Sequence, residues 1–232
     1  MKHIKYLTIV FLGILVLFTS GCAPKANVIT KGEKFPKMYD QQPRSLLILP
    51  PMNESTDAEA KDYYMTTVEM PFALMGYYVM PVEIVSDVMK QEGITNTEML
   101  YDLPLNKLQE YFGADAVLYT RIKKWDTSYM VVASHLTVSV DSEIVSTKTS
   151  EKLWSYNGTV VQDLTSRGNG GGGLAELIIN IAATAINTAA ADYVKYARIA
   201  NFRLISSVPA GPYHEMHMKD QGVQLIDQTS EK

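Results

Sequence analysis

The sequence predicts an α/β fold in which helices pack on a mixed sheet, with an antiparallel hairpin and one long helix toward the C-terminus. Three observations lead to this prediction. Residues 45–49 form a short, almost wholly apolar run that two prolines end, helix signals separate it from later apolar runs, and residues 134–147 alternate between apolar and polar side chains. The first pattern is typical of a strand buried on both faces, and alternation indicates a strand with one wet face. Helices and strands mixed in this order form a sheet with helices packed on it.

The first 22 residues have the layout of a bacterial lipoprotein signal peptide. Residues 1–6 carry basic side chains, residues 9–18 are apolar, and two small residues precede Cys22, the only cysteine. The apolar run is short for a membrane-spanning helix, which needs about 20 residues. An ordinary secretory signal or an uncleaved anchor would leave this placement of the cysteine as coincidence. We therefore predict a signal peptide at 1–21 and lipidation, including a palmitate-type acyl chain, at Cys22.

The residues that flank Cys22 bear on its processing and its destination. Thr19 stands at a position where leucine is more frequent in such signals. Ala23 follows the cysteine, where an aspartate would favour retention in the inner membrane. We therefore expect a lipid anchor in the outer membrane, with the domain facing the periplasm or the cell surface.

The composition of the mature chain excludes some classes of protein. Without its signal peptide the chain has 19 Lys and Arg against 25 Asp and Glu, a formal net charge of −6. A protein that binds nucleic acid through its charge needs a basic face, so no nucleic-acid partner is expected. With a single cysteine, no intramolecular disulfide can form.

Residues 22–44 are rich in proline and lysine and have no sustained apolar period, so a linker is predicted there. After the strand at 45–49, capping residues and prolines bound the next elements. Met70-Pro71 should end the first helix, and Gly93 and Gly113 fit the ends of the two later ones. The predicted elements are a helix over 57–69, a strand over 77–82 and helices over 84–91 and 104–112.

The second half of the domain begins with a strand over 115–124. The alternating strand 134–147 returns as 152–162 and forms an antiparallel hairpin. A glycine-rich loop then leads into a helix over about 174–200, and the segment from 206 onward is polar and rich in proline and glycine. These boundaries predict one α/β domain at 45–205 and a flexible tail at 206–232.

The long helix is the candidate interaction surface. Its polar residues recur every three or four positions and form one narrow stripe, while the rest is apolar or small. A helix that lies on one sheet buries one stripe, so this helix needs cover on a second side. It could pair with its copy in a homodimer, dock another envelope protein, or be buried within its own domain, and these alternatives stay open. The candidate interface residues are Ala182, Ala185, Ile186, Ala189, Ala190 and Tyr193.

Four segments together carry a family resemblance, namely residues 46–53 (LLILPPMN), 76–82 (GYYVMPV), 112–119 (FGADAVLY) and 153–158 (LWSYNG). Their order behind a lipoprotein signal resembles the lipoprotein family of unknown function that includes a Neisseria surface vaccine candidate. The layout is more remotely similar to the curli secretion lipoprotein CsgG, the penicillin-binding-protein activator LpoB and the N-terminal domain of TolB. The resemblance covers about residues 22–205. It implies a compact envelope domain that works through protein contacts, and it carries over no catalytic residue.

Candidate chemistry is weak throughout the chain. The loop 168–173 lacks the Gly-Lys-Ser/Thr ending that a phosphate-binding loop needs. His214 and His217 have the spacing of half a metal site but lie in the predicted tail with no other ligand cluster nearby. Asp141 and Glu143 share one strand face, where two acids are more often simply solvated than catalytic. We therefore predict no enzyme, no metal site and no cofactor.

These observations lead to one leading hypothesis and one alternative. The leading hypothesis is a non-enzymatic binding or assembly lipoprotein of an envelope transport or secretion apparatus, with other envelope lipoproteins as possible partners. The alternative is a periplasmic regulator of a peptidoglycan synthase, as the similarity to LpoB implies. A hydrolase has no motif in its support.

Overall fold

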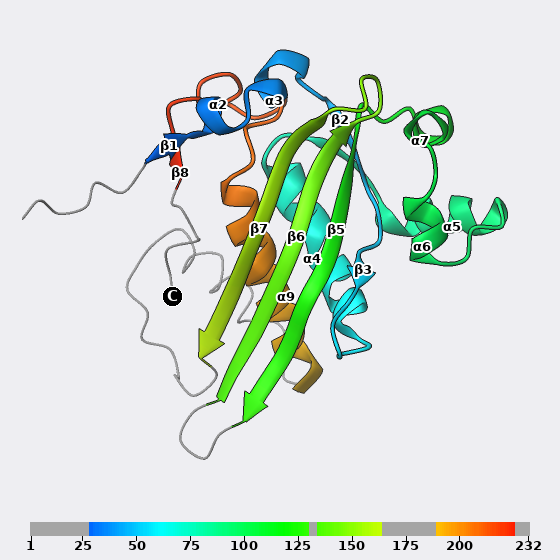
Figure 1. The fold of residues 1–232 in the computed structure, drawn as a ribbon, viewed down its shortest axis with the longest axis vertical. Helices are drawn as coiled ribbons and strands as arrows, with labels where there is room; N and C mark the ends of the chain where they lie inside the picture. Colours follow the sequence, from blue (N-terminus) through cyan, green and yellow to red (C-terminus); the bar gives the residue numbers. More distant parts are fainter. Residues whose placement is uncertain (1–27, 130–133, 164–188, 226–232) are drawn as a thin grey trace, which may run out of the picture.

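The computed structural model describes residues 28–129, 134–163 and 189–225, and its centre is a six-stranded mixed sheet (Figure 1). The strand order is β4-β2-β5-β6-β7, and β3 pairs with β5 off this path. β2 is parallel to β4 and β5, while β5, β6 and β7 are antiparallel neighbours. The strands are β2 (Ser45–Ile48), β3 (Met52–Asn53), β4 (Tyr78–Met80), β5 (Ala116–Tyr129), β6 (Ser134–Ser146) and β7 (Lys152–Asp163). The predicted α/β class and the C-terminal hairpin are confirmed.

Seven helices lie in the described ranges and cover the sheet unevenly. α4 and α9 pack on one face along its length, whereas α5, α6 and α7 cover the other face only over β2, β4 and the start of β5 (Figure 1). The helices are α2 (Lys31–Lys34), α3 (Pro36–Gln41), α4 (Ala60–Leu74), α5 (Val82–Gln91), α6 (Thr97–Tyr101), α7 (Leu105–Phe112) and α9 (Ala189–Ser206). Part of one sheet face is therefore without a helical cover in the described chain.

The predicted burial of the first strand on both faces is confirmed. Leu46 and Ile48 point into the core beneath α4 and α9, and Leu47 and Leu49 point into the core beneath α5–α7. All four are at most 1% exposed. Burying a leucine or isoleucine side chain stabilises the fold by about 1.5–3 kcal/mol. β2 therefore joins the two helical layers through alternate side chains.

The alternation along β6 also has the predicted consequence. Val138, Val140 and Ile144 are buried against the helices, while Asp141 and Glu143 lie half-buried on the opposite face. β5 ends five residues later than predicted because it pairs with β6 as far as Tyr129, past a bulge after Ile122. The added residues include Asp126, Thr127 and Ser128, which pair with Thr137, Leu136 and His135 of the next strand.

The predicted end of the first helix is wrong. The sequence suggested that Met70-Pro71 stops it, but α4 continues through Pro71 to Leu74. Proline inside a helix removes one backbone hydrogen bond. Phe72 is fully buried in the main core and Pro71 is buried as well. The apolar burial that the extra turn provides offsets the lost hydrogen bond.

For the described residues, the predicted linker and flexible tail are wrong as well. β1 (Ile29–Thr30) pairs antiparallel with β8 (Gln224–Leu225) in a second, small sheet. Phe35 and Met38 belong to the main core, and the buried Lys31 Nζ lies 3.4 Å from the buried Asp220 carboxylate. The proline and glycine residues here form turns of an ordered layer. We call residues 28–42 and 207–225 the terminal pole, which lies at one end of the long axis (Figure 1).

Candidate functional site

The uncovered part of the sheet is the broadest candidate surface, and we call it the open sheet face. Outward residues of β7 such as Ser155 and Asn157 are exposed, while their neighbours Trp154 and Tyr156 are buried on the helical side. In the described ranges the helical cover of this face ends at Tyr101 of α6, whose ring meets Tyr119 edge to face and lies 5.5 Å from the Arg121 guanidinium. The open sheet face consists of Arg121, Lys124, Ser139, Asp141, Glu143, Ser155, Asn157 and Thr159.

Polar groups on the open sheet face pair with one another across the strands. Asn157 Nδ2 donates to Asp141 Oδ1 at 2.5 Å, and Lys152 Nζ lies 2.6 Å from Glu143 Oε2. Each acid of the candidate pair therefore has its own cross-strand partner, and the two do not face a common cleft. Such cross-strand pairs stabilise a sheet by about 0.2–1 kcal/mol each. The surface is thus a flat, hydrogen-bonded polar face, suited to contact rather than to acid–base chemistry.

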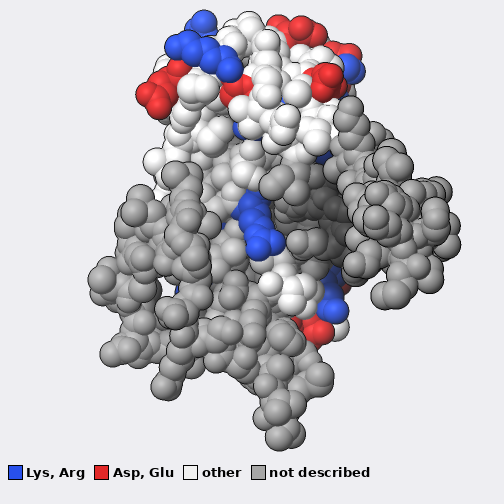
Figure 2. All heavy atoms as spheres, turned by 90° about the vertical axis from the view of Figure 1, so that its left-hand side faces the viewer, with Lys and Arg blue, Asp and Glu red and all other residues white. Residues whose placement is uncertain are grey.

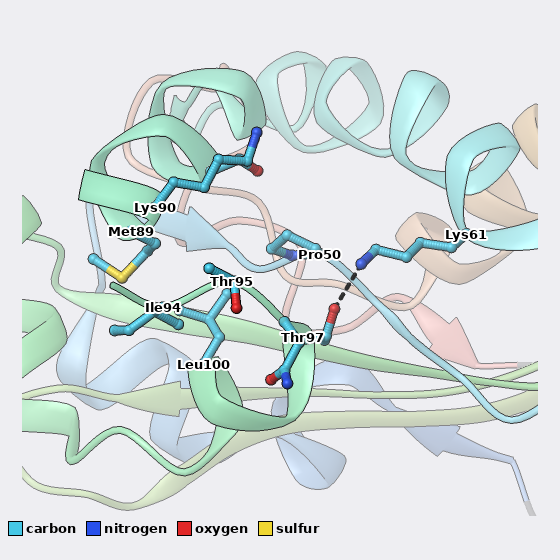
Figure 3. Close-up of a pocket in the computed structure, with 10 residues that line it drawn as sticks. Pro50, Lys61, Met89, Lys90, Ile94, Thr95, Thr97 and Leu100 are labelled. Carbon is cyan, nitrogen blue, oxygen red and sulfur yellow. Dashed lines mark hydrogen bonds between the residues drawn. The ribbon is translucent and has the colours of Figure 1, made fainter. Parts of the chain in front are cut away.

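A small pocket lies between α4, α5 and α6 beyond the end of β2 (Figure 3). Lys61 Nζ crosses toward α6 and donates to Thr97 Oγ1 at 2.6 Å, as Figure 3 shows. The volume of the pocket is about 100 Å³, well below the roughly 300 Å³ of the smallest pockets that bind organic ligands. The lining residues are Pro50, Lys61, Ser86, Met89, Lys90, Ile94, Thr95, Asn96, Thr97 and Leu100. The pocket has room for water but not for a substrate.

A larger cleft of about 590 Å³ lies where the terminal pole meets the sheet. Its centre is Asp115, which accepts hydrogen bonds from the Arg44 and Ser45 backbone amides and from Lys148 Nζ at 2.6 Å. Burial raises the pKa of Asp115, but these hydrogen bonds outweigh it and hold the pKa below its usual value. The cleft is lined by Gln41, Gln42, Arg44, Asp115, Lys148, Pro212 and His217. Its carboxylate is an ionised structural group and not a free general base.

The predicted interface helix is only partly described. Cys22, Ala182, Ala185 and Ile186 lie outside the described residues, and Ala189, Ala190 and Tyr193 lie at the start of α9 without described side chains. The later turns of α9 pack on α4, with Ala197, Ala200 and Leu204 at most 1% exposed. Asn201 Nδ2 also donates to Thr67 Oγ1 of α4 at 2.9 Å. This half of the helix is buried within its own domain, and the interface prediction stays a prediction.

The other candidates from the sequence are placed as follows. The glycine-rich loop 168–173 lies outside the described residues. His214 Nδ1 accepts from the backbone amide of Met216, and His217 Nδ1 lies 3.0 Å from the Ala210 carbonyl oxygen. In the described ranges no three His, Cys, Asp or Glu side chains gather as metal ligands, and none of the helices there is long and apolar enough to cross a membrane.

Sequence reasoning missed the cleft and the terminal pole altogether. Arg44, Asp115 and Lys148 meet in the cleft although more than 30 residues separate each from the next. No local pattern marks such a site.

Known proteins match this chain over most of the domain. The family described as "Putative lipoprotein GNA1162-like" matches residues 34–212. A lipoprotein of Neisseria meningitidis serogroup B, NMB1124/NMB1162, is 32% identical over 143 residues, which are 61% of this chain and 66% of the relative. The matched part thus spans slightly less than two thirds of that protein.

Several solved structures are similar to this chain to different degrees. The crystal structure of lipoprotein GNA1162 from Neisseria meningitidis is 31% identical, with a TM-score of 0.52 over 62% of this chain and 100% of that chain. A PelC dodecamer from Paraburkholderia phytofirmans is 12% identical, with a TM-score of 0.45 over 72% and 89% of the two chains. The LpoB C-terminal domain from Escherichia coli is 18% identical, with a TM-score of 0.32 over 57% and 98%. Since the family match covers more than half of the chain, the protein belongs to the GNA1162-like lipoproteins, a family with no known catalytic activity.

Proposed function

We propose that this lipoprotein is a non-enzymatic binding or assembly component of an envelope transport or secretion apparatus, anchored by acylated Cys22 in the outer membrane. The domain faces the periplasm or the cell surface. The observation that carries the proposal is the open sheet face, which is polar and has no helical cover in the part of the chain that the structure describes.

The edge of the sheet beside this face supports the same function. β7 has 12 residues and pairs only with β6 among the described strands. Long edge strands present unpaired backbone groups and are common sites for the addition of a partner strand. Val161 is 58% exposed on this edge strand and adds an apolar contact to the polar face. A protein partner therefore finds hydrogen-bonding groups, a flat surface and an apolar side chain together.

Site-specific crosslinking in cells tests the proposal. A photoreactive phenylalanine derivative at Asn157, on the open sheet face, should give a discrete crosslinked product on illumination, because a bound partner lies against this face. The same substitution at Asn106 of α7 is a matched control, since Asn106 is also an exposed asparagine but lies on the helical layer. Mass spectrometry then identifies the product.

The identity of the product decides between the two functions. A transport or secretion component, or another envelope lipoprotein, supports assembly. A peptidoglycan synthase would support the regulatory alternative and overturn the leading one. Equal products from both positions, or none from Asn157, would exclude the open sheet face as the partner surface.

A homodimer through the long helix is a second element of the proposal. We expect the mature chain to be a dimer by light scattering and its Ala189→Glu variant to be a folded monomer, because a carboxylate cannot be desolvated in an apolar helix interface at low cost. Ala73→Glu, at an exposed alanine of α4, controls for the added charge. A monomeric wild type with an unfolded Ala189→Glu variant would mean that the helix is ordinary core.

A further inference from the structure

Exposed apolar side chains gather on the terminal pole. The pole makes up about a fifth of the described chain, yet it carries six of the thirteen large apolar side chains that are exposed there. Tyr213 is 70% exposed, and Met216 and Met218 are each 40% exposed. The others are Val28, Ile29 and Val223. Single exposed apolar residues are normal, but several on one ordered element indicate a contact surface.

These side chains belong to a rigid layer rather than to a loose end. Lys31 Nζ donates to the Val208 carbonyl oxygen at 2.7 Å and lies 3.4 Å from Asp220, and both charged side chains are about 5% exposed. Asp220 also accepts from the Ala210 backbone amide and from the Tyr39 hydroxyl. The first described residues of the chain are thereby fixed to the last described ones. The direction in which the chain enters the domain is fixed with them.

The distance between the anchor and the pole is short. Cys22 precedes Val28 by six residues, which span at most about 20 Å when fully extended. A compact domain of this size is about 40 Å across. The tether is therefore shorter than the domain, and it holds the pole nearer to the bilayer than any other end of the molecule. The acylated cysteine therefore brings a lipid bilayer next to the pole, and the bilayer is the large apolar partner that we consider for it.

Charge at the pole is compatible with this partner. The pole contains four basic and four acidic residues, so the formal charge of −6 of the mature chain lies entirely elsewhere. Charged groups of both signs are interspersed with uncharged atoms at this end of the molecule in Figure 2. An anionic membrane repels the rest of the domain more than it repels the pole. The adjacent cleft is lined by Arg44 and Lys148 together with Asp115, which pairs with Lys148, so one formal positive charge of the cleft is in excess.

We propose that the terminal pole is a membrane-contact face, which lies in the headgroup layer of the bilayer that holds the Cys22 acyl chains. Tyrosine suits this layer because its ring is apolar and its hydroxyl is polar, and methionine adapts to irregular apolar surroundings. The contact fixes the orientation of the domain, so that the opposite end of the long axis, where β5 and β6 meet, points away from the membrane (Figure 1). The inference rests on the lipid anchor of the proposed function.

Methionine oxidation tests the orientation directly, because the chain has matched reporters. Met216 and Met218 lie on the pole, whereas Met99 on α6 is similarly exposed, at 45%, and lies outside it. The mature chain is coupled through Cys22, its only thiol, to maleimide lipids in phosphatidylcholine–phosphatidylethanolamine vesicles. Chloramine-T, which does not cross membranes, is then added, and mass spectrometry follows the oxidation of each methionine.

We expect oxidation of Met216 and Met218 to slow several-fold on the vesicles relative to the free chain, while Met99 keeps its rate. Equal slowing at all three positions, slowing at Met99 alone, or no change would overturn the membrane-contact face. This experiment attaches the chain to lipid by chemical coupling and does not depend on acylation. A negative oxidation result would therefore contradict the membrane-contact face but not the lipid anchor or the proposed function. Conversely, the oxidation rates would still test the membrane-contact face if Cys22 were not acylated in cells.

Discussion

Replacement of Cys22 by serine should abolish acylation and release the protein from its lipid anchor. Serine has no thiol to accept the diacylglycerol, and the lipoprotein signal peptidase then has no lipidated substrate to cleave. We expect incorporation of labelled palmitate to fall to background in Cys22→Ser, and the product to keep its signal peptide by mass. Each acyl chain contributes about 0.8 kcal/mol per buried CH₂, and stable anchoring takes two chains or more. The loss of lipid-based anchoring should therefore be nearly complete, and any membrane association that remains comes from the retained apolar segment 9–18.

A neighbouring substitution separates lipidation from general damage to the signal. Ser20→Ala keeps a small residue two positions before the cysteine and leaves the thiol in place. It should be acylated and cleaved like the wild type. Palmitate label at the wild-type level in Cys22→Ser would show that the anchor is elsewhere, and it would remove the short tether on which the orientation of the terminal pole depends.

Repetitive local patterns made most of the sheet predictable from the sequence. The apolar run at 46–49 required cover on both faces, and it lies between two helical layers. The alternation from Ser134 to Ser146 required one buried and one wet face, and the wet face is the open sheet face. Gly113 has a φ of 64°, a conformation that glycine adopts without strain, and it ends α7 as predicted. In each case neighbouring residues contained the whole signal.

Contacts between residues that are far apart in the sequence could not be predicted from local patterns. Lys31 and Asp220 are 189 residues apart, and each looks like an ordinary surface charge within its own segment. Proline and glycine in both segments suggested a linker and a tail, although the same residues also serve as turns of an ordered layer. Pro71 was misread because the sequence does not reveal that Phe72 needs one more helical turn to reach the core. The cleft around Asp115 was invisible for the same reason.

The predicted orientation places the two candidate surfaces at different heights above the membrane. β5 starts beside the cleft at the terminal pole, and its 14 residues extend about 45 Å toward the other end of the molecule. The open sheet face lies along this length. A partner that binds there is held some tens of ångströms from the bilayer without any long linker. The fold itself thus separates the binding surface from the membrane, which is the role of a linker that the sequence predicted for residues 22–44.

The Asp220→Ala substitution should destabilise the domain by about 3–5 kcal/mol, because it leaves the buried Lys31 ammonium without its counter-ion. The carboxylate also accepts from Tyr39 and the Ala210 amide, so three groups lose a partner at once. Urea unfolding measures the loss. Glu151→Ala is the matched control, since it breaks the Lys37–Glu151 pair, whose side chains are 48% and 43% exposed, and should change the stability far less.

The pH dependence of this deficit follows from the pKa of Lys31. Burial lowers that pKa below its ordinary value, while the charge and hydrogen bond of Asp220 raise it, so Asp220→Ala should lower it further. Between the lowered folded pKa and the ordinary unfolded pKa the unfolded chain binds more protons, and stability rises with pH. The deficit should therefore be largest at neutral pH and narrow toward pH 10. A double variant, Lys31→Met with Asp220→Leu, removes both charges and should recover the part of the lost stability that comes from the unpaired ammonium. If Asp220→Ala lowered the free energy of unfolding no more than Glu151→Ala, the Lys31–Asp220 pair would not hold the terminal pole together. This pair would then not fix the direction of the tether.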